Sequence, residues 1–229
     1  MGTEALKSEN LKDHSRKGVS PVYLCVKRSL DFISSLLALI VLSPIFLILI
    51  IAIKLDSKGP VLFKQKRVGI HKTHFNILKF RTMRIDTPND VPTHQLKNPE
   101  QYITKVGKFL RKTSLDELPQ IWNIFVGQMS VIGPRPALWN QYDLIEEREK
   151  YGANDVPVGL TGWAQINGRD SITIELKAKL DGEYIKRFGL IMDLRCFVGS
   201  IVSVLKSDGV VEGEAGSMNL NEKSSANHK

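Results

Sequence analysis

An apolar run over residues 32–53 limits this chain more than any other feature. Only three serines and Pro44 interrupt it. About 20 apolar residues suffice to cross the hydrocarbon core of a bilayer, so a membrane segment is expected. The run is apolar on every helical face, which disfavours a helix buried in a water-soluble core. It is not typical of a cleavable signal peptide, because it begins late and no small-residue cleavage site follows it.

A straight spanning helix and a re-entrant hairpin both remain open for this run. Ser43 and Pro44 lie in its middle, where proline removes a helical hydrogen bond and bends the chain. Each half, of about eleven residues, would reach only about 16 Å, roughly one leaflet. Ser43 and Pro44 are therefore the predicted membrane hinge.

Basic residues flank both ends of the run. Cytoplasmic flanks carry the Lys/Arg excess, so both ends favour the same side of the membrane, which supports the hairpin. Asp31 is expected either to pair with Arg28 or to lie at the membrane surface. The flanking residues are Lys27 and Arg28 before the run, and Lys54, Lys58, Lys64, Lys66, Arg67 and Lys72 after it.

The chain of 229 residues carries a formal net charge of +8. A basic protein is expected to have an anionic partner: nucleic acid, anionic lipid headgroups or a phosphorylated substrate. The sequence has no helix-turn-helix, zinc-finger, dinucleotide-binding or phosphate-loop motif, so nucleic-acid binding is not expected. Cys25 and Cys196 form no CxxC pair, which argues against a zinc site or a disulfide framework and for a reducing compartment.

Hydrophobic periodicity predicts an α+β fold after the membrane segment. Residues 61–69 and 74–81 alternate as two short strands around a turn. Residues 104–112 have the spacing of a short basic amphipathic helix, which suits a membrane surface. Residues 86–100 contain three prolines and no periodicity, so they are expected to form a loop near a site.

Residues 171–206 are expected to be helical, with two apolar faces. The faces comprise Ile172, Leu176 and Leu180, and then Leu190, Leu194, Phe197, Val198, Ile201, Val202 and Leu205. The predicted order along the chain is a flexible arm (1–21), a re-entrant membrane helix hairpin (22–55), a compact, mostly helical catalytic domain with a small β-hairpin (56–206) and a disordered tail (207–229).

Two adjacent carboxylates, Asp116 and Glu117, are the first candidates for chemistry. Ser114 and Glu117 match a capping box, which would explain them as the start of a helix. Pro119 fits poorly in the fifth helical position, so the helix is expected to begin later than the box implies. Adjacent carboxylates can also hold Mg²⁺, which takes oxygen ligands and bridges to phosphates, and a carboxylate can form an aspartyl-phosphate. A capping role and a catalytic role both remain open. The predicted apolar face of this helix comprises Leu118, Ile121, Trp122 and Phe125.

The segment Gly133-Pro134-Arg135-Pro136 fixes the backbone on both sides of one arginine, whose planar fork suits phosphate oxygens. A rigid turn with an exposed arginine is the alternative.

Other polar residues are weaker candidates. Lys79 and Arg81 flank Phe80 in the second strand and are expected either to line an anion site or to be solvated. Gln165, Asn167 and Arg169 alternate, so they are expected to face one side and read a nucleotide. Asp181-Gly182-Glu183 resembles a metal motif only loosely, and a helical surface is the favoured interpretation.

These motifs, taken in order, resemble the bacterial sugar transferases, the monotopic phosphoglycosyl transferases of capsule, exopolysaccharide and glycoprotein glycan assembly. The resemblance covers roughly residues 22–210, and the chain resembles the short catalytic-domain form. The motifs are Lys27-Arg28 with Asp31-Phe32, Ser43-Pro44, Lys79-Phe80-Arg81-Thr82-Met83, Ser114-Leu115-Asp116-Glu117-Leu118-Pro119-Gln120, Met129-Ser130-Val131-Ile132-Gly133-Pro134-Arg135-Pro136, and Gly159-Leu160-Thr161-Gly162-Trp163-Ala164-Gln165-Ile166-Asn167-Gly168-Arg169.

The resemblance implies an activity and a place in the cell. It implies transfer of a sugar-1-phosphate from a UDP-sugar to undecaprenyl phosphate with release of UMP, and Mg²⁺ as cofactor. The chain most resembles capsule enzymes that use N-acetylated amino sugars, so such a sugar is the expected donor. It implies a re-entrant helix-break-helix and interfacial helices in the bacterial plasma membrane, with the catalytic domain on the cytoplasmic leaflet. Contact with downstream glycosyltransferases and an oligomeric state are compatible with it.

The resemblance also implies residue roles. Asp116 is at the family's nucleophile position, and Glu117 matches the partner acid that assists Mg²⁺ and proton handling. Arg111 and Arg135 match phosphate-binding positions, and Lys79 and Arg81 are weaker matches. A membrane-anchored scaffold that binds anionic lipid without catalysis is the rival hypothesis. An altered acid pair or Pro-Arg-Pro segment would favour it, whereas both are intact here.

Overall fold

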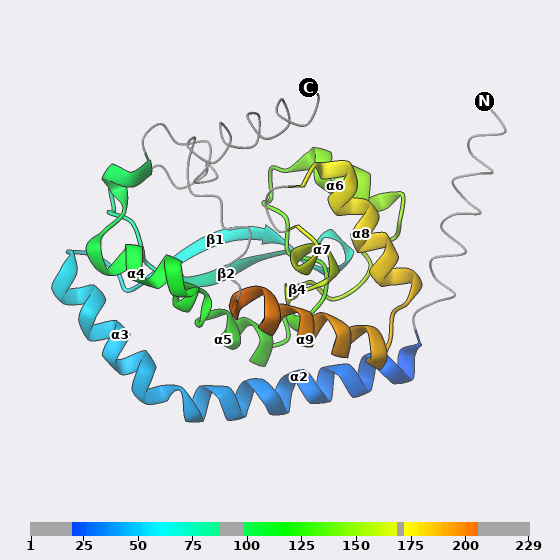
Figure 1. Ribbon diagram of the computed structural model, residues 1–229, viewed down its shortest axis with the longest axis horizontal. Coiled ribbons are helices and arrows are strands. Elements are labelled where there is room, and N and C mark those ends of the chain that lie inside the picture. Colours follow the sequence, from blue (N-terminus) through cyan, green and yellow to red (C-terminus); the bar gives the residue numbers. More distant parts are fainter. Residues whose placement is uncertain (1–19, 88–98, 169–171, 206–229) are drawn as a thin grey trace, which may run out of the picture.

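Figure 1 shows the computed structural model, which describes residues 20–87, 99–168 and 172–205. These residues form helices and two small β-sheets, which confirms the α+β class. Nearly all of the predicted N-terminal arm, the predicted tail and most of the predicted loop at residues 86–100 lie outside the described residues.

Two helices meet at the predicted hinge. α2 (Pro21–Val41) and α3 (Ser43–Asp56) are joined at Leu42 and bend by 61°. The Ser43 hydroxyl donates back to a carbonyl in the last turn of α2, at 2.7 Å. Pro44 has no N–H with which to continue the hydrogen bonding of α2. The break predicted at Ser43 and Pro44 is therefore confirmed.

Within the described chain, no single helix is long and apolar enough to cross a membrane, but α2 and α3 together pass that test by length and composition. Figure 1 shows the pair as a bent bar along the bottom of the molecule. Many apolar side chains of both helices are exposed. A re-entrant course remains a prediction that suits this shape.

A β-hairpin forms where the alternation predicted it. β1 (Leu62–Val68) and β2 (His74–Phe80) pair antiparallel, with Gln65 opposite Ile77. The turn between them contains a short 3-10 helix, η1 (Ile70–Lys72). Figure 1 shows this hairpin in the middle of the molecule, above the bent bar.

The other edge of β2 is satisfied by a side chain of α5 (Gln120–Phe125). Asn123 accepts a hydrogen bond from the Leu78 N–H at 3.0 Å and donates to Asn76 O at 2.9 Å. A buried strand edge needs such partners, because unpaired backbone groups are costly away from water. The contact fixes α5 against the strand that carries Lys79.

A second, parallel strand pair leads into the Pro-Arg-Pro segment. β3 (Ser130–Ile132) pairs with β4 (Gly159–Thr161). Gly133 follows β3, and a Cβ atom there would lie 2.3 Å from Pro157 O. Only glycine therefore lets the chain pass so close to its neighbour before it reaches Arg135.

The remaining elements confirm the helices predicted around residues 104–112 and within 171–206. These elements are η3 (Pro99–Tyr102), α4 (Lys105–Thr113), η4 (Leu115–Glu117), α6 (Tyr142–Glu149), α7 (Trp163–Ile166), α8 (Ile174–Lys186) and α9 (Leu190–Leu205). Among them, α9 packs on α7, β3 and β4, and α8 packs on α6 and α7.

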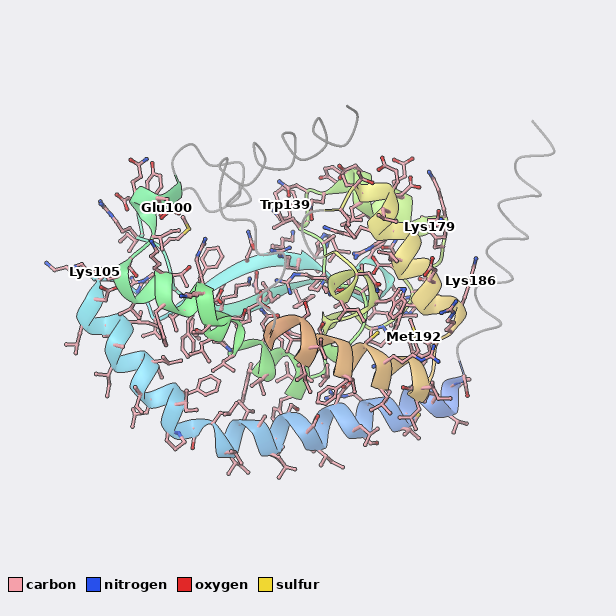
Figure 2. All side chains as sticks on the ribbon, in the orientation of Figure 1. Glu100, Lys105, Trp139, Lys179, Lys186 and Met192 are labelled. Atoms are coloured by element: carbon pink, nitrogen blue, oxygen red, sulfur yellow. The ribbon has the colours of Figure 1, made fainter. Side chains whose placement is uncertain are left out.

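The apolar faces predicted on α8 and α9 do not build the core. Leu176 is exposed, and α8 buries Tyr184 and Ile185 instead. Lys179 and Lys186 project outward from the same helix (Figure 2). The stripe on α9 is also exposed, over Leu190, Leu194, Phe197, Val198, Ile201 and Val202.

A polar residue sets the orientation of α9. Asp193 is buried, and its carboxylate accepts hydrogen bonds from Lys27, Tyr23 and Tyr184. Those partners lie inside the molecule, so the side of α9 that carries Asp193 turns inward together with Cys196. The apolar stripe is left outside.

The face predicted for α5 is wrong in part. Ile121 is buried, but Trp122 is 50% exposed. Gln120 and Asn123 are fully or almost fully buried in its place. The polar side chains turn inward because Asn123 serves the edge of β2, whereas Trp122 lies outside and contacts Phe125.

Candidate active site

The acid pair lies on a short 3-10 turn between two helices. α4 ends at Thr113, and Ser114 adopts the left-handed conformation with a φ of 57°. Ser114 makes no side-chain cap, so the predicted capping box is wrong. An α-helix capped there would need an N–H at Pro119, which proline lacks. Asp116 and Glu117 lie in η4 and α5 begins only after them, which confirms the later start.

Glu117 is held by two cations. Lys79 Nζ donates to Glu117 Oε1 at 2.9 Å, and the Arg135 guanidinium reaches both carboxylate oxygens. Burial by itself would raise the pKa of Glu117, but Arg135 and Lys79 outweigh it and hold the pKa well below its usual range. Glu117 is therefore a stable anion near neutral pH.

Asp116 has a different environment from its neighbour. Burial raises the pKa of its carboxyl group; the charge of Lys79 offsets part of this effect, and Glu117 adds to it. Within the described chain, the Asp116 side chain accepts no hydrogen bond. Its oxygens are therefore available to bind a cation or to attack an electrophile.

A stiff loop presents Arg135 to the acid pair. Pro134 and Pro136 restrict the backbone on both sides. Arg67 donates to Pro136 O at 3.1 Å, and Arg135 itself lies 3.4 Å from Leu160 O. The Arg135 side chain thus lies between the acid turn and β4 and contacts both.

Arg111 and Lys79 complete the positive surroundings of Asp116. Both are close enough to lower the pKa of the Asp116 carboxyl group. Arg111 Nε donates to Thr82 Oγ1 at 3.0 Å, which fixes the side chain between α4 and the end of β2. Lys79, Arg111 and Arg135, from three separate sequence motifs, therefore lie near the carboxylate of Asp116.

Arg81 does not join them. It is buried, and its guanidinium donates to Ser57 O and Lys58 O at 2.7 Å each. β2 ends at Phe80, so the alternation that would place Arg81 beside Lys79 no longer applies. Arg81 instead satisfies carbonyls at the end of α3, and its predicted place in an anion site is wrong.

Two of the residues predicted to alternate and read a nucleotide, Gln165 and Asn167, do not lie on a strand. Gln165 is part of α7, and Asn167 follows that helix and donates to Trp163 O at 2.7 Å. The predicted alternation is therefore wrong, because successive helical residues are turned by about 100°. Arg169 lies outside the described residues.

Gln165 nevertheless lies beside the Pro-Arg-Pro segment. A Cβ atom at Gly162 would be 2.1 Å from Gly133 O and 3.1 Å from Gln165 Oε1, so all three groups are adjacent. Both polar atoms of the Gln165 amide are buried without a hydrogen-bond partner among the described residues. The amide of Gln165 therefore has donor and acceptor capacity that no described residue uses.

Asp181 is structural and does not belong to a metal motif. Its Oδ2 accepts from Arg148 Nε at 2.8 Å, and both side chains are buried. Gly182 packs on the ring of Tyr151, so this part of α8 faces inward. The prediction that Asp181, Gly182 and Glu183 form an exposed helical surface is therefore wrong. Glu183 accepts a hydrogen bond from Trp163 Nε1 at 3.1 Å.

The sequence model of the bacterial sugar transferases matches residues 22–207. The chain belongs to this family. An undecaprenyl-phosphate glucose phosphotransferase from Komagataeibacter xylinus is 38% identical to it over an alignment of 192 residues, and the match covers 79% of this chain and 36% of that protein. The UDP-glucose:undecaprenyl-phosphate glucose-1-phosphate transferase of Escherichia coli (strain K12) is 38% identical over 77% of this chain and 39% of that protein.

A relative of similar length is an uncharacterised sugar transferase, EpsL, from Bacillus subtilis (strain 168). It is 37% identical over 187 residues, which cover 82% of this chain and 91% of that protein. This sugar transferase thus spans about a third of the first relative and nearly all of the last.

Three charged residues of α2 were not recognised as part of the sugar transferase's frame. Lys27 is buried and paired with Asp193 on α9. Arg28 donates to carbonyls at the end of α5, and Asp31 is buried and accepts from the Val131 N–H, so neither alternative given for Asp31, a pair with Arg28 or a place at the membrane surface, describes its position. The spacing of four between Lys27 and Asp31 was the available signal, because it places both on one side of a helix.

The residues of the acid turn fit a Mg²⁺ ion that substrate helps to bind. Mg²⁺ commonly takes one or two carboxylates and completes its shell with water and phosphates. Asp116 offers oxygens that no described donor occupies, whereas Lys79 and Arg135 engage those of Glu117. The described residues contain no cluster of three His, Cys, Asp or Glu that would hold a metal alone.

Proposed function

We propose that this sugar transferase moves a sugar-1-phosphate from a UDP-sugar to undecaprenyl phosphate and releases UMP. The observation that carries the proposal is the pairing of two unlike acids, the unpartnered Asp116 and the cation-held Glu117, inside a ring of positive side chains. The names of the relatives support the reaction class, because two of them are glucose phosphotransferases that use undecaprenyl phosphate.

In the proposed first step, an Asp116 oxygen attacks the β-phosphorus of the donor. A bond forms between that oxygen and phosphorus, and the bond from phosphorus to the bridging oxygen breaks, so UMP leaves with the electron pair. In the second step, an oxygen of undecaprenyl phosphate attacks the same phosphorus and Asp116 is released. Arg135, Arg111 and Lys79 supply positive charge for the phosphate oxygens.

A Mg²⁺ ion held by the acid turn would neutralise donor phosphate charge. Glu117 is proposed to keep Lys79 and Arg135 in place until the donor phosphates arrive. Its low pKa makes it a poor proton acceptor near neutral pH, which favours positioning over general-base work. Removal of Mg²⁺ with EDTA should abolish UMP release, and added Mg²⁺ should restore it.

The proposed location is the cytoplasmic leaflet of the bacterial plasma membrane. The bent helix pair and the exposed apolar stripe of α9 both support contact with lipid. A lipid-borne acceptor needs a site at the membrane surface, which these elements would provide. Protease digestion in sealed inside-out vesicles tests this: both the N-terminal arm and the catalytic domain should be cut from the cytoplasmic face.

The identity of the sugar remains a prediction. Sequence resemblance favours an N-acetylated amino sugar, whereas the relatives' names indicate glucose. A panel of UDP-sugars with undecaprenyl phosphate, read out as UMP release, decides between them. If the purified chain releases no UMP from any donor, the non-catalytic membrane scaffold becomes the better account.

A further inference from the structure

The membrane helix α2 touches the frame of the active site through buried polar contacts. Asp31 is only 6% exposed, and its Oδ1 accepts a hydrogen bond from the Val131 N–H at 2.9 Å. Arg28 donates to Ile124 O and Phe125 O at 2.7 Å each. These contacts face the catalytic domain rather than lipid.

We propose that Asp31 and Arg28 are positioning residues of the active site, which act on Arg135 through β3 and on the acid turn through α5. The inference rests on the proposed phosphoglycosyl transfer, because it assigns these residues an effect on that reaction. It separates two tasks of α2: its apolar part holds the membrane, and its polar contacts set catalytic geometry.

The Asp31 contact fixes the outer edge of β3. Ser130 and Ile132 pair with β4, so the N–H of Val131 between them points away from that strand. Asp31 supplies the acceptor that a third strand would otherwise provide. Arg135 follows Val131 by four residues, and prolines flank it, so a shift of β3 is carried to the guanidinium.

The Arg28 contact fixes the far end of α5. Carbonyls in the last turn of a helix lack partners within the helix, and a cation there satisfies them and favours the helix dipole. The chain leaves α5 through Gly127, and a Cβ atom there would lie 3.2 Å from Arg28 Nη2. α5 follows the acid turn directly, so the position of α5 determines where Asp116 and Glu117 stand.

Steady-state UMP release by the full-length chain in detergent tests the β3 arm, using whichever UDP-sugar the wild type turns over. Asp31→Ala removes the acceptor, and we expect KM for the UDP-sugar to rise about tenfold, because Arg135 is displaced. Asp31→Asn keeps an acceptor oxygen and should return KM to within about threefold of wild type. Ser29→Ala, on the same helix, is the matched control, because Ser29 is exposed and its hydroxyl donates to Cys25 O within α2.

KM is the decisive reading, because misfolded protein lowers the maximal rate but leaves the KM of the remaining enzyme unchanged. Wild-type KM in Asp31→Ala would therefore overturn the proposal. If that variant does not fold, Arg28→Met tests the second arm. Its kcat, normalised to the amount of folded protein, is expected to fall about tenfold, and that of Arg28→Lys to be intermediate. Unchanged kcat in Arg28→Met would overturn that arm.

Hydrogen exchange supplies a reading that needs no turnover. Peptides that cover residues 129–136 should exchange faster in Asp31→Ala than in wild type, and at the wild-type rate in Asp31→Asn and Ser29→Ala. Unchanged exchange in Asp31→Ala would contradict transmission through β3. A wild-type chain that releases no UMP would instead reject the proposed function, while the exchange result still stands on its own.

Discussion

Two carboxylate–arginine contacts in this molecule look alike and differ in what they leave open. Asp181 on α8 and Arg148 on α6 are 1% and 4% exposed and form a closed pair between these helices. Glu117 meets two cations, Lys79 and Arg135, which are 20% and 33% exposed. The first pair has no access for a ligand, whereas the second has surplus positive charge that a phosphate can reach. Access and excess charge therefore mark a site better than an acidic motif does.

The largest expected effect is a difference in activity between variants of Asp116, in the acid turn, and of Asp181, in the closed pair. Asp116→Asn should lower UMP release by at least about 10³-fold, because the amide cannot form the covalent intermediate. Asp181→Asn, the matched change in the closed pair, should retain activity per folded molecule. Initial rates normalised to folded protein make the comparison, and normal turnover in Asp116→Asn would falsify the nucleophile assignment.

Stability gives a second test of Asp116. The raised pKa of Asp116 means that the folded state disfavours its ionised form, so its contribution to stability is present below the ordinary value near 3.9 and is lost as pH rises through the raised pKa. Asp116→Asn should therefore melt at a higher temperature than wild type near neutral pH, with the difference vanishing in acid.

The closed pair can be broken from one side. Asp181→Ala leaves Arg148 buried without its counter-charge and should destabilise the fold by about 3–5 kcal/mol. Asp155→Ala removes a carboxylate from an exposed pair with His71 and should change stability by less than about 0.5 kcal/mol. Chemical denaturation measures both, and equal effects would show that the closed pair is not the stabilising one.

A smaller effect is expected at Arg135. Arg135→Lys keeps the charge but loses the planar fork, so kcat/KM for the UDP-sugar should fall about 10- to 100-fold. Arg84→Lys, in the exposed pair with Asp86, is the control and should leave kcat/KM unchanged. Arg135→Lys with wild-type kinetics would remove this residue from the phosphate site.

The smallest effect is a pH dependence. The lowered pKa of Glu117 means that its ion pairs stabilise the fold above the ordinary value near 4.3, and that this stability is lost as pH falls toward the lowered pKa. The melting temperature of wild type should therefore drop more steeply below pH 5 than that of Glu117→Gln, which cannot ionise. Parallel curves would show that Glu117 is not held by Lys79 and Arg135 in solution.

Local sequence rules predicted the parts of the fold that depend on neighbours in the chain. Pro44 predicted the break between α2 and α3, alternation predicted the hairpin, and Pro119 predicted the late start of α5. The motifs also indicated Glu117 and Arg135 as site residues, and these two meet at the acid turn. Both lie on segments whose backbone is restricted by neighbouring prolines.

The failures came from contacts between distant segments. Arg81 turns to the end of α3 because free carbonyls lie there, and α9 turns its apolar stripe outward because Asp193 has buried partners. The capping pattern at Ser114 did not reveal a left-handed residue, since the same letters fit either backbone. Neither spacing nor composition carries information about which distant donor meets which acceptor.

The buried pair of Lys27 and Asp193 has a consequence for biosynthesis. The two residues lie 166 positions apart, so the ribosome delivers Lys27 long before Asp193. Until α9 emerges, Lys27 has no counter-charge, and burying an unpaired ammonium is costly enough to keep this part of α2 in water. α2 is therefore synthesised before α9 but completes its docking only when α9 is present. A nascent chain that stops before residue 193 would lack this link between α2 and α9.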